Sequence, residues 1–300
     1  MARPRPPVAE PADVGVEVAD PGRDAVAIGR PAAPADLARR PLAEVSAVLA
    51  IAHRDFVKLL RDRLRLFSEL AFPLILVLLL GPSLQAGYGS PGGLDLTTFV
   101  FTGVLAQTVW QSAAMGLISL IADREEDFSQ EIFVSPISRY SIVAGKIIGE
   151  ALVALPTGLG LLVVAVLIGV RMSPLTLLAL LPVTIAVAVY GGAFGLLVLS
   201  NISSQRAAAQ IFPFVMLPQF FLAGVFNPIH DLPLPLAVLS ALSPMRYAVE
   251  ATRNAFYGTQ PGVVAPEITD ATVNVGVIAG SFLAFVAIGT VLFVRSERNR

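Results

Sequence analysis

Six long apolar segments lie between Leu66 and Val294, and they dominate what this chain can fold into. A hydrocarbon core of about 30 Å requires about 20 apolar residues in a helix that crosses it. The mean hydropathy of +0.74 and the 55% of hydrophobic residues exceed what a soluble domain of 300 residues can bury. The sequence therefore predicts an all-α integral membrane protein with six transmembrane helices. The expected spans are Leu66–Leu84, Thr97–Ile121, Lys146–Val170, Pro174–Leu199, Ala207–Val225 and Val273–Val294.

Lysine and arginine are distributed unevenly around these spans. Cytoplasmic segments of membrane proteins carry an excess of these residues. With the N-terminus in the cytoplasm, only Arg171, Arg246 and Arg253 of the 21 basic residues lie on the outer side. We therefore expect both termini to be cytoplasmic. The preference for arginine over lysine, with much Ala, Pro and Gly, indicates a GC-rich bacterial genome and hence a bacterial plasma membrane.

The two ends of the chain differ from its apolar middle. Residues 1–41 are rich in Pro, Ala and Arg, with scattered acids and almost no large apolar side chain. Such a segment cannot bury enough surface to offset its ordering entropy, so we predict a disordered cytoplasmic tail. Residues 295–300 are expected to form a short cytoplasmic C-terminal tail.

Residues 42–65 show the periodicity of an amphipathic helix, with apolar residues on one face and basic residues on another. A basic amphipathic helix beside a membrane usually lies in the interface, with its cations near the lipid phosphates. Two interpretations remain: a simple interfacial anchor, or an anchor that also forms part of a docking surface for a cytoplasmic partner. The residues that define this helix are Arg54, Phe56, Lys58, Arg61 and Arg65.

The connection between the second and third spans is longer and more charged than a turn requires. Two to eight residues suffice to join neighbouring helices, whereas this connection uses about twenty. Its acidic start suits the first turn of a helix, and a proline ends that helix. A solvated charged loop is one interpretation; a cytoplasmic helix that docks on a partner is the one we favour. Its expected contact residues are Asp123, Arg124, Glu125, Glu126, Phe128, Glu131, Phe133, Pro136 and Arg139.

The segment Gly224–Pro244 is apolar but rich in proline, which precludes a single straight helix. Broken backbone at membrane depth is tolerated only against protein or a water-lined cavity. We therefore predict a re-entrant hairpin near the outer surface, between the fifth and sixth spans. His230 lies in its turn, either simply hydrated or touching substrate. The residues expected to form this hairpin and the adjoining gate are Asn227, Pro228, His230, Pro244, Tyr247, Glu250 and Arg253.

The helix that follows the hairpin begins at Pro244, with Ser243 as its cap and Gly258 as its end. Its charged residues share one stripe and allow Arg–Glu pairs at a spacing of three or four residues. The stripe predicts either a solvated face or an outer gate or dimer contact.

A few polar residues lie inside the predicted spans. Gln107, Trp110 and Gln111 are candidates for a substrate path, because amides at membrane depth need partners; packing between helices explains them equally well. Lys146 and Glu150 lie one turn apart, which predicts an ion pair with the lysine reaching toward the interface. Glu150 is alternatively the best available ion-binding acid.

Several kinds of chemistry are excluded by missing residues. The chain has no cysteine and only two histidines, which excludes thiol chemistry and a multi-histidine metal site. A phosphate-binding loop needs a glycine five residues before Gly-Lys and then Ser or Thr, but the only Gly-Lys pair is followed by Ile147. No protease motif or paired aspartates occur in the spans. We therefore expect no enzyme activity, no metal and no cofactor bound by this chain.

Two stretches carry a resemblance to a known family. They are EIFVSPISRYSIVAGKIIGE (Glu131–Glu150) and FFLAGVFNPIHDLPLPLAVLSALSPMRYAVEATRNAFYG (Phe220–Gly258). With the six-span pattern, they resemble the permease subunits of type-2 ABC exporters, in particular the drug-exporting subgroup that includes the daunorubicin-resistance permeases. The second stretch matches the family's helix motif through Ser243, Pro244, Tyr247, Glu250 and Arg253.

The resemblance implies that residues 66–294 form a six-helix permease domain that exports amphipathic, drug-like or lipid-like molecules. ATP with Mg would bind to a separate cytoplasmic ATPase, and a second permease copy or a paralogue would complete the transporter. Membrane lipids are expected partners, and nucleic acid is not. The alternative is an ion- or proton-coupled secondary transporter that uses Glu150. A small-residue motif, Gly191-x-x-x-Gly195, predicts close helix packing, either static within one unit or moving during transport.

Overall fold

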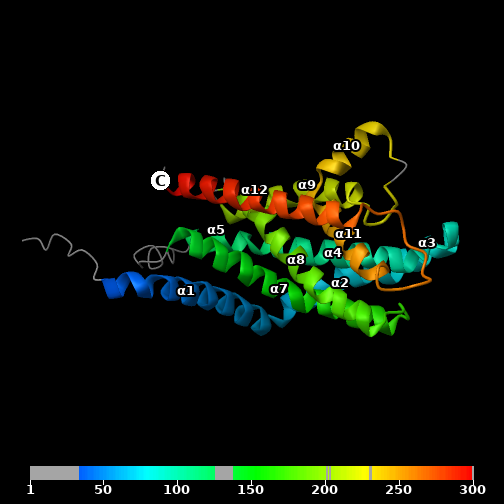
Figure 1. Cartoon of the computed structure of the whole chain (residues 1–300), viewed down its shortest axis with the longest axis horizontal. Helices are drawn as coiled ribbons and strands as arrows, with labels where there is room; N and C mark the ends of the chain where they lie inside the picture. The colour runs from blue at the N-terminus through cyan, green and yellow to red at the C-terminus, as the bar shows by residue number, and fades with distance from the viewer. Residues whose placement is uncertain (1–33, 126–137, 201, 203, 230–231, 299–300) are drawn as a thin grey trace, which may run out of the picture. The chain divides into compact units, whose positions relative to one another are not determined.

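The computed structural model describes residues 34–125, 138–200, 202, 204–229 and 232–298. Within these ranges every regular element is helical (Figure 1). The elements are α1 (Pro34–Arg61), α2 (Arg63–Ile75), the π-helical turn η1 (Leu76–Leu80), α3 (Gly81–Tyr88), the 3₁₀ turn η2 (Pro91–Gly93), α4 (Leu96–Gly116), α5 (Ile118–Glu125), α7 (Arg139–Leu167), α8 (Pro174–Leu199), α9 (Gln205–Leu222), α10 (Leu234–Leu242), α11 (Pro244–Tyr257) and α12 (Ala271–Arg298).

Five stretches of the described chain are long and apolar enough to cross a membrane. Five of the six predicted spans coincide with them, with ends that differ by a few residues. The predicted fifth span, Ala207–Val225, corresponds to α9, which is not among the five because its glutamines and Arg206 dilute its hydropathy. A sixth membrane crossing therefore stays a prediction. The five stretches are Arg63–Tyr88, Leu96–Ala122, Tyr140–Leu167, Pro174–Leu199 and Ala271–Arg295.

Helix α4 forms the centre of the core. Within Leu96–Ala122, 72% of an apolar 18-residue segment is buried by the rest of the protein. The corresponding share is 17% in Arg63–Tyr88 and in Ala271–Arg295. The helix packs against α7, α8 and α11. The outer stretches keep most of their surface apolar and uncovered by protein, as helices that contact lipid do.

Small residues allow α8 to approach α4 closely. A Cβ atom at Gly191 would overlap the carbonyl oxygen of Trp110, and one at Gly195 would overlap that of Ala114. Glycine is therefore required at both positions of the predicted motif. The contact lies within one chain, between α8 and α4.

We expect Gly195→Ala to destabilise the protein by about 1–3 kcal/mol, because the added methyl group forces two packed backbones apart. The free energy of unfolding in mixed detergent micelles, measured by titration with a denaturing detergent, checks this. Gly276→Ala in α12 is the matched control, since nothing lies within 4 Å of a Cβ there. A Gly195→Ala protein as stable as the control would contradict the close contact.

The amphipathic segment predicted as one helix over residues 42–65 belongs to two helices in the structure. Helix α1 begins at Pro34, before the predicted start, and ends at Arg61. Asp62 then caps α2 by accepting a hydrogen bond of 3.0 Å from the backbone N–H of Arg65. The prediction that Arg65 shares the basic face of one helix is therefore wrong, because a short polar side chain starts a new helix before it.

The proline-rich segment after α9 is broken, as its sequence predicts. Gly224 has a φ of 71°, a left-handed conformation that glycine adopts without strain. Helix α10 follows, and its Ser240 hydroxyl donates to the carbonyl of Leu222 at 2.6 Å. Figure 1 shows α3 and α10 at one end of the helices, with α5 and the C-terminal end of α12 at the other.

Candidate functional site

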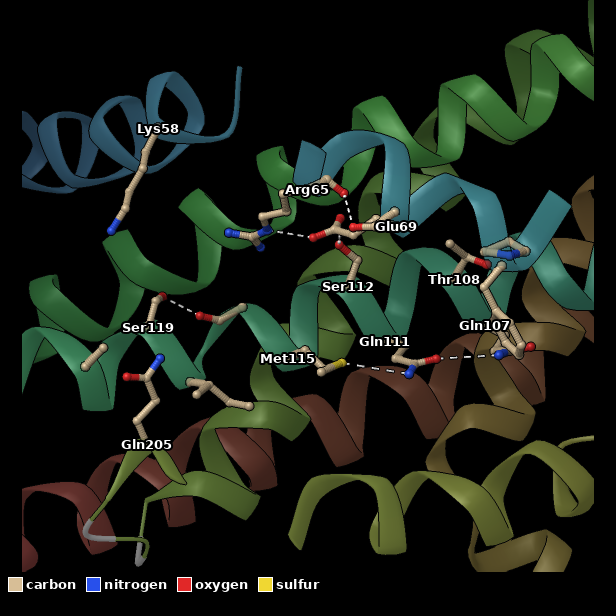
Figure 2. Close-up of a pocket in the computed structure, with 16 residues that line it drawn as sticks. Lys58, Arg65, Glu69, Gln107, Thr108, Gln111, Ser112, Met115, Ser119 and Gln205 are labelled. Carbon is tan, nitrogen blue, oxygen red and sulfur yellow. Dashed lines mark hydrogen bonds and ion pairs between the residues drawn. The ribbon is translucent and has the colours of Figure 1, made fainter. Parts of the chain in front are cut away.

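A cavity of about 560 Å³ with a mixed polar and apolar lining lies between α2, α4 and α5, with contributions from α1 and α9 (Figure 2). Two of the three predicted substrate-path residues, Gln107 and Gln111, line it. The third, Trp110, does not: its side chain is fully buried and packs on Phe194, with ring centroids 4.8 Å apart. The two glutamines lie four residues apart and share the face that Trp110 does not occupy.

The carboxylate of Glu69 organises one wall of the cavity. It accepts a hydrogen bond of 2.7 Å from Nε of Arg65, one of 3.2 Å from the hydroxyl of Ser112 and one of 3.4 Å from that of Thr157. These partners lie on α2, α4 and α7, so a single carboxylate joins three helices. The sequence analysis missed Glu69, although an acid inside an apolar span, one turn after an arginine, was a signal.

The glutamines form a polar strip along α4. Nε2 of Gln107 donates to Oε1 of Gln111 at 3.5 Å, and Nε2 of Gln111 lies 3.8 Å from the sulfur of Met115. Oε1 of Gln107 is buried and has no hydrogen-bond partner among the described residues. A buried amide oxygen without a partner is available to a donor on a ligand.

Beside the cavity, a buried ionic cluster joins α1 to α7. Nζ of Lys146 lies 2.8 Å from Oδ2 of Asp55 and 3.6 Å from Oε1 of Glu150. The predicted Lys146–Glu150 pair is thus confirmed. The prediction that the lysine reaches out to the interface is wrong, because Lys146 is only 2% exposed and turns inward to Asp55, which the sequence analysis missed.

Glu150 is held by further contacts. Its Oε1 accepts a hydrogen bond of 2.8 Å from the hydroxyl of Ser119, while its Oε2 is buried and has no partner among the described residues. A Cβ atom at Gly116 would overlap the carboxylate, so the absence of a side chain there makes room for the acid. Ser119 also lines the cavity, which brings the ionic cluster to its edge.

The charged stripe of α11 is not a solvated face. Arg253 is 3% exposed, and its Nη2 donates to the carbonyls of Phe99, Gly224 and Val225 at 3.3, 2.8 and 3.5 Å. Its guanidinium also lies 3.8 Å from the centroid of the Phe99 ring. The stripe turns inward because the loop after α9 presents carbonyl groups that need a donor.

The remaining predicted hairpin residues have local roles where they are described. Glu250, which is buried, pairs with Arg246 at 3.0 Å, as the spacing predicts. The Tyr247 hydroxyl donates to the carbonyl of Ala241 at 2.7 Å, and Nδ2 of Asn227 donates to that of Pro228 at 3.3 Å. Pro244 is the first residue of α11. His230 lies outside the described residues.

The predicted docking segment falls mostly outside the described residues, which contain neither Glu126, Phe128, Glu131, Phe133 nor Pro136. Asp123, Arg124 and Glu125 belong to the last turn of α5, and Arg139 is the first residue of α7.

The residues predicted to define the amphipathic helix have different environments. Lys58 lines the cavity, and Arg61 is exposed. Nη2 of Arg54 lies 3.0 Å from Oδ1 of Asp55, so this cation joins the ionic cluster. Phe56 lines a separate apolar groove beside α7 and α8.

Comparison with known proteins identifies the family. The family model described as "ABC-2 type transporter" matches residues 46–257. This chain belongs to the ABC-2 type transporter family. The resemblance drawn from the sequence is thereby confirmed, and the chain is a multi-pass membrane permease. ABC-2 permeases lack a catalytic domain and work with ATPase subunits. In the described residues no group of His, Cys, Asp and Glu could hold a metal ion.

Individual relatives of this ABC-2 permease are distant. Nodulation protein J of Rhizobium leguminosarum bv. viciae is 23% identical over 82% of this chain and 93% of its own length. The putative transport permease ycf38 of Cyanophora paradoxa is 22% identical over 70% of this chain and 73% of its own length. The probable multidrug ABC transporter permease YbhR of Escherichia coli K12 is 29% identical over 54% of this chain and 45% of its own length.

Proposed function

We propose that this chain is the membrane-spanning subunit of an ATP-driven exporter of amphipathic or hydrophobic molecules, drug-like or lipid-like, from the cytoplasm or the inner leaflet. A cytoplasmic ABC ATPase supplies the energy, and a second permease copy or a paralogue completes the passage. Six helices cross a bacterial plasma membrane, with α9 as the fifth, and both termini are cytoplasmic. The α9–α10 hairpin then faces outward.

The observation that carries this proposal is the cavity of about 560 Å³ on the helices of an ABC-2 permease. Its lining combines amides and charged groups with the apolar Phe72, Pro73 and Met115. A cavity of this size accommodates a drug-sized molecule, and mixed lining suits an amphipathic one. The name of one relative, a probable multidrug ABC transporter permease, agrees with transport of such molecules.

The orientation is supported by the arrangement of the helices. Helix α5, which leads into the acidic docking segment, lies at the same end as the basic C-terminal end of α12 (Figure 1). Lys and Arg favour the cytoplasmic side, which supports a cytoplasmic position for this end.

ATP-dependent transport tests the proposal. The chain is co-expressed with its candidate ABC ATPase partner, and the complex is reconstituted in liposomes with a fluorescent amphipathic drug. We expect accumulation of the drug that requires hydrolysable ATP and is lost when the ATPase is omitted. Transport by the permease alone would overturn the proposal.

The docking role of the segment after α5 gives a separate prediction. Replacing Asp123, Glu125, Glu126 and Asp127 with their amides is expected to lower copurification of the ATPase by about tenfold, because the interface loses four charges. Glu267→Gln, an exposed acid in the loop before α12, is the control and leaves copurification unchanged. Equal recovery of the ATPase with both proteins would show that the acids do not dock.

One observation favours an ion-coupled carrier as a second candidate. Glu150 is buried beside the cavity, with one carboxylate oxygen that has no partner among the described residues. A membrane-embedded acid of this kind is typical of proton- or cation-coupled transport. Transport by the purified chain without an ATPase, driven by an ion gradient and abolished by Glu150→Gln, would support this candidate.

A further inference from the structure

The charged groups of the cavity are concentrated at one end. Among its described lining residues, the cations are Lys58, at the end of α1, and Arg65, in the first turns of α2, and the carboxylate is that of Glu69. In Figure 2 the Arg65 guanidinium points away from Gln107 and toward the side on which Lys58 and Gln205 lie. Two cations from different helices therefore border the same part of the cavity.

These cations are not equally neutralised. Arg65 is joined to Glu69 through Nε, at 2.7 Å, which leaves its terminal nitrogens without a hydrogen bond to another described residue. Lys58 is exposed and forms no ion pair or hydrogen bond within the described part of the chain. Among the described residues that line the cavity, two cations stand against one carboxylate, so the lining itself carries a net positive charge.

The other end of the cavity has different chemistry. Phe72 and Pro73 follow Arg65 by seven and eight residues on α2, a rise of about 10–12 Å along a helix. Gln107, Thr108 and Gln111 face them from α4. A ligand that fills the cavity thus meets cations at one end and a largely uncharged, partly aromatic wall at the other.

We propose that this cavity binds the anionic head group of an amphiphile, with Lys58 and Arg65 as its cationic contacts and the apolar part of the ligand against Phe72 and Pro73. Arg65 offers paired N–H donors that match phosphate or carboxylate oxygens, and Lys58 adds a point charge. The turn between α1 and α2 lies at the start of the membrane-spanning stretch Arg63–Tyr88, and in the proposed orientation this start faces the inner leaflet. If the bound amphiphile is the cargo, this inference rests on the proposed export function. Binding of an anionic head group in the cavity does not depend on that function.

The test compares two probes that share a chain length and differ in head-group charge: dodecyl phosphate and dodecylphosphocholine. Binding to the purified full-length chain in a neutral maltoside detergent is measured by native mass spectrometry, as the fraction of protein that carries one adduct. We expect dodecyl phosphate to bind about tenfold more tightly, the size of one or two charge-assisted hydrogen bonds. Equal affinities, or no adduct with dodecyl phosphate, would overturn the proposal.

The matched variants are Lys58→Gln and Arg61→Gln. Each removes one cation from the last turn of α1, but only Lys58 lines the cavity. We expect Lys58→Gln to weaken binding of dodecyl phosphate about five- to tenfold, and Arg61→Gln to change it less than about twofold. An equal loss with both variants would mean that the protein attracts anions only through its general surface charge, and the proposed site would be wrong.

Arg65 is tested together with its partner, since its removal alone would strand the carboxylate of Glu69. The double variant Arg65→Gln, Glu69→Gln keeps a hydrogen-bonding pair, and we expect it to lose the preference for the phosphate probe. Arg63→Gln, an exposed cation at the start of α2, is its control and keeps that preference. If the double variant does not elute as a single folded species, the Lys58 and Arg61 pair decides the question alone.

A competitor identifies the source of the ligand. Phosphatidylglycerol is added to the complex with dodecyl phosphate. If it displaces the probe, the natural ligand is an anionic membrane lipid. If it does not, the natural ligand is a separate anionic amphiphile, the cargo. Both results support an anion site. The measurement contains no ATPase, so failure of ATP-dependent transport would overturn the export function and leave this result intact.

Discussion

Lys146→Met is expected to destabilise the protein by about 3–5 kcal/mol, because it leaves the buried Glu150 without its cation and leaves the buried Asp55 with Arg54 alone. Asp55 and Glu150 are 6% and 4% exposed at their side chains, so water cannot replace the lysine. The same change separates α1 from α7, which the Lys146–Asp55 contact of 2.8 Å joins. Unfolding in mixed detergent micelles, followed by helical circular dichroism, measures the loss.

Two further variants test the cause of that loss. Asp55→Asn with Glu150→Gln, added to Lys146→Met, removes the stranded charges, and we expect it to recover a large part of the stability. Lys58→Met, which removes an exposed cation with no partner among the described residues, is expected to change stability by less than about 0.5 kcal/mol. A Lys146→Met protein as stable as the Lys58→Met protein would contradict a buried ionic cluster.

Arg253→Met is expected to destabilise the protein by about 2–4 kcal/mol, because it removes the donor shared by three buried carbonyls and the cation on the Phe99 ring. Two of those carbonyls, of Gly224 and Val225, belong to the turn that starts the hairpin after α9. We therefore expect the hairpin to loosen first. Protease cleavage after α9, together with the free energy of unfolding, measures both effects.

Arg246→Met is the control on the same helix. Arg246 is 22% exposed, and its partner Glu250, at 3.0 Å, is buried, so its removal also leaves a carboxylate without its cation. We expect a comparable loss of stability but less added cleavage after α9, because Arg246 does not bind the carbonyls of Gly224 and Val225. The role assigned to Arg253 is wrong if the two variants expose the hairpin equally.

Much of the fold was predictable because it depends on local pattern. Apolar runs of about 20 residues specify membrane helices wherever they occur, and capping residues such as Ser173 and Ser204 mark the starts of α8 and α9. Helix α9 shows the limit of this reasoning, because its glutamines and Arg206 leave it less apolar than the other spans. The break at Asp62 was also missed, since the basic periodicity continues through it to Arg65.

The candidate site was predictable only in part. Gln107 and Gln111 were identified because amides are uncommon at membrane depth, whereas Trp110 was assigned to the same path and packs on Phe194. Periodicity places these residues on one helix, but it does not say which face meets a cavity. Glu69 was overlooked because the sequence does not reveal that Ser112 and Thr157, far along the chain, approach its carboxylate.

The sequence by itself determined that this protein is a helical membrane permease, since span length and the motifs that carry the family resemblance are local properties of the chain. Only the tertiary structure decided which partners its buried charged side chains contact. Asp55 meets Lys146 across 91 residues, and Arg253 meets the carbonyl of Phe99 across 154. A buried charge must find a partner, and which one it finds depends on which helices lie side by side.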